Sequence, residues 1–240
     1  MPTLLRINHQ SHPHQLELKR SQVPYYCDGC KEPGFGLCYQ CPNKNCNFFL
    51  DEECGINLPS HSHQLLQNCH FKFYKENPRR HLRICDACGK VIQGFLYQCS
   101  HKPGHDLHPC CAKLPLSFSD NGMEICLRNE VNSKCLKCQS KAKFSWFYVS
   151  KSGEYCYHVA CMKEAWLENW KKDYFQLDAA KNGNLVLQNL APKEVAPRDG
   201  QSSKVKKGMK WLIVFLNLVV SAIFGDPLSL ISSMFQFYQN

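Results

Sequence analysis

Pairs of cysteines separated by two residues occur three times in this chain, and this spacing is typical of metal sites. Each pair is followed about twenty residues later by a His-x-x-Cys motif or, once, by Asp-x-x-Cys. Two residues between cysteines let a tight turn aim both sulfurs at one point, and the later motif completes a tetrahedron. Zn²⁺ prefers this ligand set in closed structural sites. The three sets are Cys27, Cys30, Asp51 and Cys54; Cys85, Cys88, His108 and Cys111; and Cys135, Cys138, His158 and Cys161.

The composition also predicts small modules that depend on metal. The chain has 240 residues, with 17 cysteines and 11 histidines. A module of roughly 50 residues buries too little apolar area to be stable alone, so it relies on metals or disulfides. Residues 1–19 contain no apolar core of a secretory signal, and histidines recur at fixed offsets from the cysteines. We therefore expect zinc rather than disulfides, and an intracellular location in the cytoplasm or nucleus.

The three motifs belong to a tandem repeat. Cys41 and Cys99 each lie eleven residues after the second cysteine of a pair, within a Tyr-Gln-Cys sequence, and Ser150 stands near that place in the third repeat. Upstream, the sequence HPHQL at 12–16 aligns with HSHQL at 61–65. These matches predict units at 9–61, 62–118 and 119–171.

The repeated motifs resemble those of the plant divergent C1 (DC1) domains, which are cysteine- and histidine-rich relatives of the C1 zinc finger. The resemblance covers about residues 9–171. It rests on the His-x-His-x-Leu opening, Cys-x2-Cys, Tyr-x-Cys, and His-x2-Cys followed by Leu-Pro. It implies small zinc-stabilised, β-rich modules of the α+β class in tandem, each holding two zinc ions by interleaved ligands. One site takes the Cys-x2-Cys pair and the closing motif, and the other takes the opening His, the middle cysteines and a final His or Cys.

Carried over residue by residue, the resemblance implies about four zinc ions. In the first unit Asp51 replaces the usual His, and because a carboxylate is a harder ligand we expect a weaker, more acid-labile site. The second unit has an incomplete second site, in which His63 and Cys99 are present and His101 or His105 would have to substitute. The third unit keeps only its closing set. The second site of the first unit is implied to be His14, Cys41, Cys46 and His61.

Several remaining side chains are expected to be structural. Free cysteines are commonly small buried apolar residues. Trp166 and Trp170 lie four apart, which predicts a helix that packs back onto the third unit. Aromatic residues near the metal motifs are expected to fill the small cores: Tyr39, Phe95, Tyr97 and Trp146. The cysteines that fit no predicted site are Cys38, Cys69, Cys110, Cys126 and Cys156.

The C-terminal part has a different composition. Residues 172–209 read as a polar linker, and residues 210–240 as an apolar helical tail that contains the uncharged run 211–224. That run is shorter than the about 20 residues that a membrane-spanning helix needs. Three positions for the tail stay open: a membrane surface on the cytoplasmic side, reached through the preceding lysines, a partner or second copy of the chain, and packing within the chain.

The sequence contains no recognisable catalytic motif, such as a phosphate-binding loop, a nucleophile elbow or His-Glu-x-x-His, so we expect no enzyme. The expected function is a zinc-binding interaction scaffold with unidentified protein partners, acting in intracellular signalling or stress responses as the resemblance implies. One alternative is a RING- or PHD-like ubiquitin-ligase or chromatin-reading module, but each unit closes with His/Asp-x2-Cys rather than Cys-x2-Cys. Another is nucleic-acid binding, which the net charge of +9 allows but no basic aromatic face supports. The interval from Cys30 to Cys41 is short for a diacylglycerol-binding loop, so that ligand is not expected.

Overall fold

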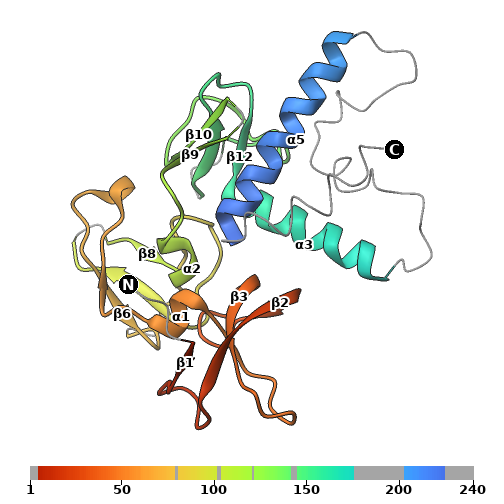
Figure 1. The fold of residues 1–240 in the computed structure, drawn as a ribbon. Helices are drawn as coiled ribbons and strands as arrows, with labels where there is room; N and C mark the ends of the chain where they lie inside the picture. The colour runs from red at the N-terminus through yellow and green to blue at the C-terminus, as the bar shows by residue number, and fades with distance from the viewer. Residues whose placement is uncertain are drawn as a thin grey trace. The chain divides into compact units, whose positions relative to one another are not determined.

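The computed structural model describes residues 5–78, 81–101, 104–120, 122–141, 145–175 and 203–224. By their contacts these residues form two compact units, one that runs to Leu114 and one from Pro115 to Ile223. The predicted linker therefore lies outside the described residues except at its two ends, as does the tail after Phe224. Figure 1 shows the elements of both units.

Three four-stranded antiparallel sheets form, one for each predicted repeat, and all three have their strands in chain order. The prediction of small β-rich modules in tandem is thus confirmed. The sheets begin at Arg6, Ser60 and Ser117, a few residues before the predicted unit boundaries at 9, 62 and 119. The first module contains β1 (Arg6–Ile7), β2 (Leu16–Tyr26), β3 (Pro33–Gln40) and β4 (Phe49–Asp51); the second β5 (Ser60–His61), β6 (Phe71–Tyr74), β7 (Leu96–Cys99) and β8 (Asp106–Leu107); the third β9 (Ser117–Asp120), β10 (Met123–Arg128), β11 (Phe147–Ser150) and β12 (Cys156–His158).

A helix follows the fourth strand of every sheet. These helices are α1 (Glu52–Ile56), α2 (Pro109–Ala112) and α3 (Val159–Phe175), each beginning directly after the Asp or His of a closing motif. The cysteine of that motif is three residues further on, which places it one helical turn away on the same side. A 3₁₀ turn, η1 (Gln64–Leu66), precedes β6, and α5 (Ser203–Phe224) is the last described helix.

Each module has a core of only a few apolar side chains. A tyrosine of the third strand is buried in every module, at Tyr39, Tyr97 and Tyr148. It lies opposite a buried residue of the fourth strand, namely Leu50, Leu107 or Tyr157. The predicted core positions Phe95 and Trp146 are buried as well. Cores of this size supply little stability by themselves, so metal binding has much to contribute.

The first two modules pack against each other within the first unit. The amide of Phe95 donates to the carbonyl of Gly29 at 2.9 Å. A Cβ atom on Gly94 would lie 2.0 Å from that same oxygen, so the close approach requires glycine at this position. An ion pair of 3.2 Å joins Lys113 to Glu53 at the same interface. The two modules therefore form one folded unit.

The described part of α5 packs within the second unit. Phe215 is fully buried, and its ring lies 5.4 Å from that of Tyr155 and 5.6 Å from that of Tyr157, measured between centroids. None of the helices in the described part of the chain combines the length and apolarity that crossing a bilayer requires. Of the three expected positions for the tail, packing within the chain is the one that these contacts match. Membrane or partner contact through residues 210–240 stays a prediction.

Candidate metal centres

Each module contains one group of four metal-binding side chains built from a cysteine pair and a closing motif; we call these the closing clusters. In each cluster the four ligand atoms all lie within 4.8 Å of one another. The first two clusters are buried at every position, whereas Cys138 of the third is exposed. The closing clusters are Cys27, Cys30, Asp51 and Cys54; Cys85, Cys88, His108 and Cys111; and Cys135, Cys138, His158 and Cys161.

The same backbone turn presents the cysteine pair in all three modules. The residue after the second cysteine has a left-handed conformation, with φ of 65° at Lys31, 68° at Gly89 and 58° at Gln139. Its amide donates to the carbonyl of the first cysteine at 2.9, 2.7 and 2.8 Å, respectively. A turn of this kind brings the two cysteines of the pair close together, so that their sulfurs lie within 4.8 Å of each other. The residue after the first cysteine also donates its amide to the fourth-strand segment, as Asp28 does to the carbonyl of Phe49 at 2.7 Å and Asp86 to that of Asp106 at 2.9 Å.

The fourth strand docks against this turn through the first sulfur. The amide of Asp51 lies 3.2 Å from the sulfur of Cys27, and the corresponding distances are 3.4 Å from His108 to Cys85 and 3.5 Å from His158 to Cys135. Burial raises the pKa of Cys27, but hydrogen bonds from neighbouring thiols and from the Asp51 amide lower it to about 3. A thiolate is the form of cysteine that binds metal.

Distances between ligand atoms fit a tetrahedral zinc ion. Bonds of about 2.0–2.3 Å to nitrogen and sulfur place neighbouring ligand atoms roughly 3.3–3.8 Å apart. The sulfur of Cys88 lies 3.4 Å from Nδ1 of His108, and that of Cys138 lies 3.3 Å from Nδ1 of His158. In the first module the sulfur of Cys30 lies 3.2 Å from Oδ2 of Asp51. All four positions come from the protein, so these are closed sites of the structural kind.

Asp51 is the one carboxylate among these ligands. The hydroxyl of Tyr25 donates to Oδ1 at 3.0 Å, which leaves Oδ2 to face the sulfurs. Burial, followed by the negative charge of Cys27, raises the pKa of Asp51 well above its usual value. A metal cation in the cluster would compensate this buried charge. The structure thus places Asp51 where the sequence predicts it.

The second closing cluster reaches across to the first module. Nε2 of His108 lies 3.7 Å from Oε1 of Glu32, and both side chains are almost fully buried. Because Nδ1 faces the sulfurs, Nε2 is the nitrogen available to a second group. Burial opposes protonation of His108, but contacts with Cys85 and Cys88 raise its pKa to about 11. At this distance the two groups interact through charge rather than through a hydrogen bond.

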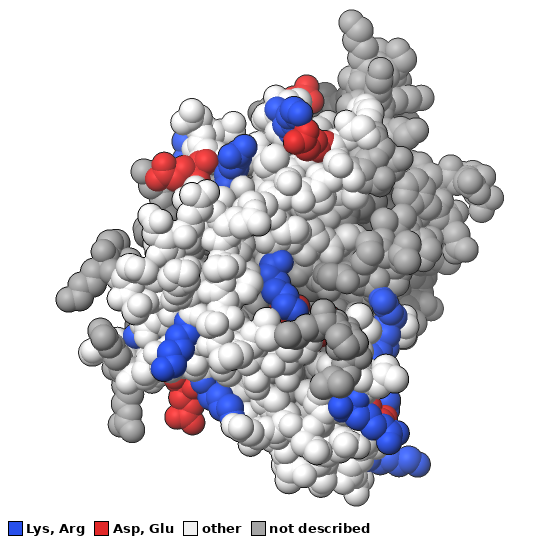
Figure 2. All heavy atoms as spheres, turned by 60° about the vertical axis from the view of Figure 1, so that its left-hand side comes forward, with Lys and Arg blue, Asp and Glu red and all other residues white. Residues whose placement is uncertain are grey.

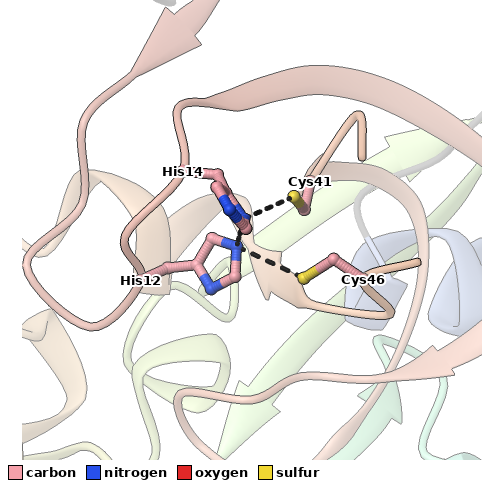
Figure 3. A group of neighbouring side chains, drawn as sticks. All are labelled: His12, His14, Cys41 and Cys46. Carbon is pink, nitrogen blue, oxygen red and sulfur yellow. Dashed lines mark hydrogen bonds between the residues drawn. The ribbon is translucent and has the colours of Figure 1, made fainter. Parts of the chain in front are cut away.

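A second type of group lies where the second strand of a module begins and its third strand ends. We call these groups the loop clusters. In the first module this cluster is formed by His12, His14, Cys41 and Cys46 (Figure 3). The sulfur of Cys41 lies 3.5 Å from Nδ1 of His14, the sulfur of Cys46 lies 3.4 Å from Nε2 of His12, and these two nitrogens lie 3.3 Å apart. Phe48 stacks on the His12 ring at 4.1 Å and fixes its orientation. These donors also suit zinc.

His61 is absent from this cluster, so the predicted grouping needs a correction. His61 lies on β5, and its Nε2 lies 2.6 Å from the carbonyl of Ala112. His12 takes the place that the resemblance implied for His61. All four ligands of this cluster therefore come from the first module. The sequence contains both His12 and His61, and the strand arrangement brings His12 to the cluster.

Two histidines that the sequence suggested for the second site of the second module, His63 and His105, contact other groups instead. Nδ1 of His63 accepts from the Leu65 amide at 3.1 Å, and Nε2 lies 3.1 Å from the carbonyl of Leu114. His105 lies 3.0 Å from a carboxylate oxygen of Asp86. The structure instead brings a different set together, formed by Cys69, Cys99 and His101. Cys69 had fitted no site in the sequence.

The third module has no loop cluster among its described residues. Register aligns Tyr148 of β11 with Leu127 of β10, as Tyr39 is aligned with Leu18 in the first module. Counting back along the strand, Met123 stands where the first module has His14. Ser150, two residues after Tyr148, stands where Cys41 follows Tyr39. The expected loss of the second site in this module agrees with these replacements.

On the face drawn in Figure 2, the charged side chains of the described residues are dispersed. Figure 2 shows Lys and Arg side chains scattered among uncharged atoms on the visible face. Among the described residues, basic side chains also pair with acids, as Arg6 does with Glu17 at 2.8 Å and Lys151 with Glu124 at 2.5 Å. Phosphate-binding faces usually gather basic residues on one side.

Comparison with known proteins agrees with a small zinc-binding module of the C1 class. The family model described as the C1 domain matches residues 10–55. This match covers the first module, with both of its clusters, and shows that it is a C1-like domain. No curated protein and no solved structure matches the chain. The repeated clusters extend the zinc-binding character to the second and third modules.

Proposed function

We propose that this chain is a non-catalytic, zinc-dependent interaction scaffold of the plant DC1 type, acting in intracellular signalling or stress responses. The observation that carries the proposal is the closure of the metal sites. Each closing cluster supplies four protein ligands, and such sites stabilise folds rather than activate water. Folded in this way, the modules offer their exposed strands and loops to partners.

The proposal is tested by binding that depends on zinc. Proximity labelling in cells with the full chain would supply candidate partners, and the leading partner would then be purified. Its dissociation constant would be measured against the zinc-loaded chain and against a chain depleted by a chelator. We expect saturable binding that falls at least tenfold on depletion. Binding that is unchanged in the depleted chain would contradict the proposal.

The same protein preparation distinguishes the other candidate functions. Discharge of ubiquitin from a charged conjugating enzyme would favour a RING-like ligase, and binding to histone tail peptides would favour a PHD-like reader. Retention of DNA or RNA on filters, falling steeply with salt, would favour a nucleic-acid-binding protein. A scaffold of the kind proposed gives none of these three signals.

A further inference from the structure

The loop cluster of the second module, Cys69, Cys99 and His101, is the least expected feature of the structure. The sulfur of Cys99 lies 3.2 Å from Nδ1 of His101, and the three ligand atoms all lie within 4.8 Å of one another. Cys69 and Cys99 are buried, whereas His101 is exposed. The donors are the same two types that the closed sites of this chain use.

Strand register shows that this group is the counterpart of the loop cluster in the first module. Phe73 pairs with Tyr97 in the second sheet, as Leu18 pairs with Tyr39 in the first. Four residues before Leu18 stands His14, and four residues before Phe73 stands Cys69. Two residues after Tyr39 and Tyr97 stand Cys41 and Cys99. Cys69 therefore replaces a histidine at the same position of the fold.

One ligand position of the first loop cluster, that of His12, has no ligand at the corresponding place in the second module. His12 precedes His14 by two residues, and the residue two before Cys69 is Gln67, which is exposed and is not a zinc ligand. No fourth Cys, His, Asp or Glu of the described residues belongs to the group. The neighbouring His105 is held by Asp86 at 3.0 Å. A zinc site with three protein ligands leaves its fourth position to water or another small donor.

We infer that Cys69, Cys99 and His101 bind a zinc ion whose open fourth position takes an external nitrogen or sulfur donor. Two thiolates and a neutral imidazole balance the charge of Zn²⁺, and with three protein ligands the fourth position would hold water in the free protein. Imidazole and thiolate are the donors that zinc prefers over water. The exposed His101 lets such a donor approach from solvent. This inference rests on the zinc dependence in the proposed function, to which it adds a labile ion.

The test uses the full chain loaded with zinc and a colorimetric chelator, 4-(2-pyridylazo)resorcinol. We expect one ion to leave in a fast phase, at least tenfold faster than the others. His101→Ala and Cys69→Ser should each abolish that phase while the slowly released ions remain. Cys126→Ser is the matched control, because Cys126 is half-buried and belongs to no cluster of the described residues. A fast phase that survives both ligand variants would overturn the inference.

Cobalt substitution tests the open position itself. Imidazole or 2-mercaptoethanol added to the cobalt-loaded chain should change its visible absorption, and His101→Ala should remove the change. No spectral change with either donor would show that the position is not open. Loss of the slowly released ions in the parent chain would contradict the proposed function instead. The two proposals therefore fail by different results.

Discussion

The two types of metal cluster differ in how consistently the repeats keep them. The closing cluster has four ligands in every module, whereas the loop cluster has four in the first, three in the second and, among described residues, none in the third. A closing cluster joins the cysteine turn to the fourth strand and the helix after it, so it holds the centre of the fold. A loop cluster joins the start of the second strand to the loop after the third strand, at the edge of the module. The central cluster is therefore the one that a module needs most.

The third module shows what takes the place of a loop cluster. Met123 and Ser150 stand at the ligand positions, and they line a shallow pocket together with Tyr155 and Trp211 of α5. The hydroxyl of Ser150 accepts from the Tyr155 amide at 3.1 Å, which closes the loop without metal. Apolar packing of α5 against Tyr155 and Tyr157 adds burial on this unit. Packing and hydrogen bonds thus do locally what a metal ion does in the first module.

Removing a ligand from a closing cluster should have the largest effect. We expect Cys85→Ser to release one tightly bound zinc and to unfold the second module, because structural zinc sites contribute roughly 10 kcal/mol or more to folding. Elemental mass spectrometry and thermal unfolding followed by circular dichroism would measure both. Cys126→Ser should change neither. A Cys85→Ser chain with unchanged zinc content and unfolding temperature would show that the second module does not depend on its closing cluster.

Removing the packing that stands in for metal should come next. Phe215→Ala deletes a buried ring and should lower the free energy of unfolding of the second unit by about 3 kcal/mol. The zinc content should stay the same, since no ligand is touched. Urea unfolding with a zinc count on the same sample tests this. Loss of zinc together with stability would mean that α5 supports a metal site after all.

The loop cluster of the first module can be tested by two histidine variants. His12→Ala should lower zinc affinity at that site on the order of a hundredfold, about 2.7 kcal/mol. His61→Ala should leave the affinity unchanged, because His61 lies against the carbonyl of Ala112. Competition with a chelator of known affinity measures both. The reverse pattern would restore the grouping predicted from the sequence.

A smaller effect is expected at Asp51. Tyr25→Phe removes the hydroxyl that holds Oδ1 and should weaken zinc binding in the first closing cluster about tenfold. Tyr97→Phe is the control, because that hydroxyl donates to the carbonyl of Leu58 at 2.8 Å and contacts no ligand. Chelator competition again provides the measurement. Equal effects of the two variants would exclude a role for Tyr25 in orienting the carboxylate.

The sequence predicted the closing clusters in full because their ligands depend on local geometry. A cysteine turn and a helical turn each fix a spacing that is visible in the chain, and both recur three times. The loop clusters depend on strand register, which alignment of HPHQL with HSHQL set incorrectly. In the structure His61 lies opposite Phe71, as Ile7 lies opposite Leu16, so His61 corresponds to Ile7. The second His-x-His therefore begins at the first strand of its module, several residues before the position of the first His-x-His. Cys69 was missed for the same reason.

The tail could not be placed from the sequence because an apolar run satisfies several environments equally well. Length and charge alone could not choose between a bilayer, a partner and the chain itself. Phe215 packs against Tyr155 and Tyr157, which lie more than fifty residues earlier in the chain. Such pairings follow from the fold of the third module and leave no local signal.

The most direct test of the account is a zinc count on the full chain by native mass spectrometry, with a thiol titration of the same sample. We expect four tightly held ions, three in the closing clusters and one at His12, His14, Cys41 and Cys46, with all cysteines reduced. A fifth ion should be present before chelator treatment and absent after it. Two or fewer ions, or disulfides in place of zinc, would contradict the central claim.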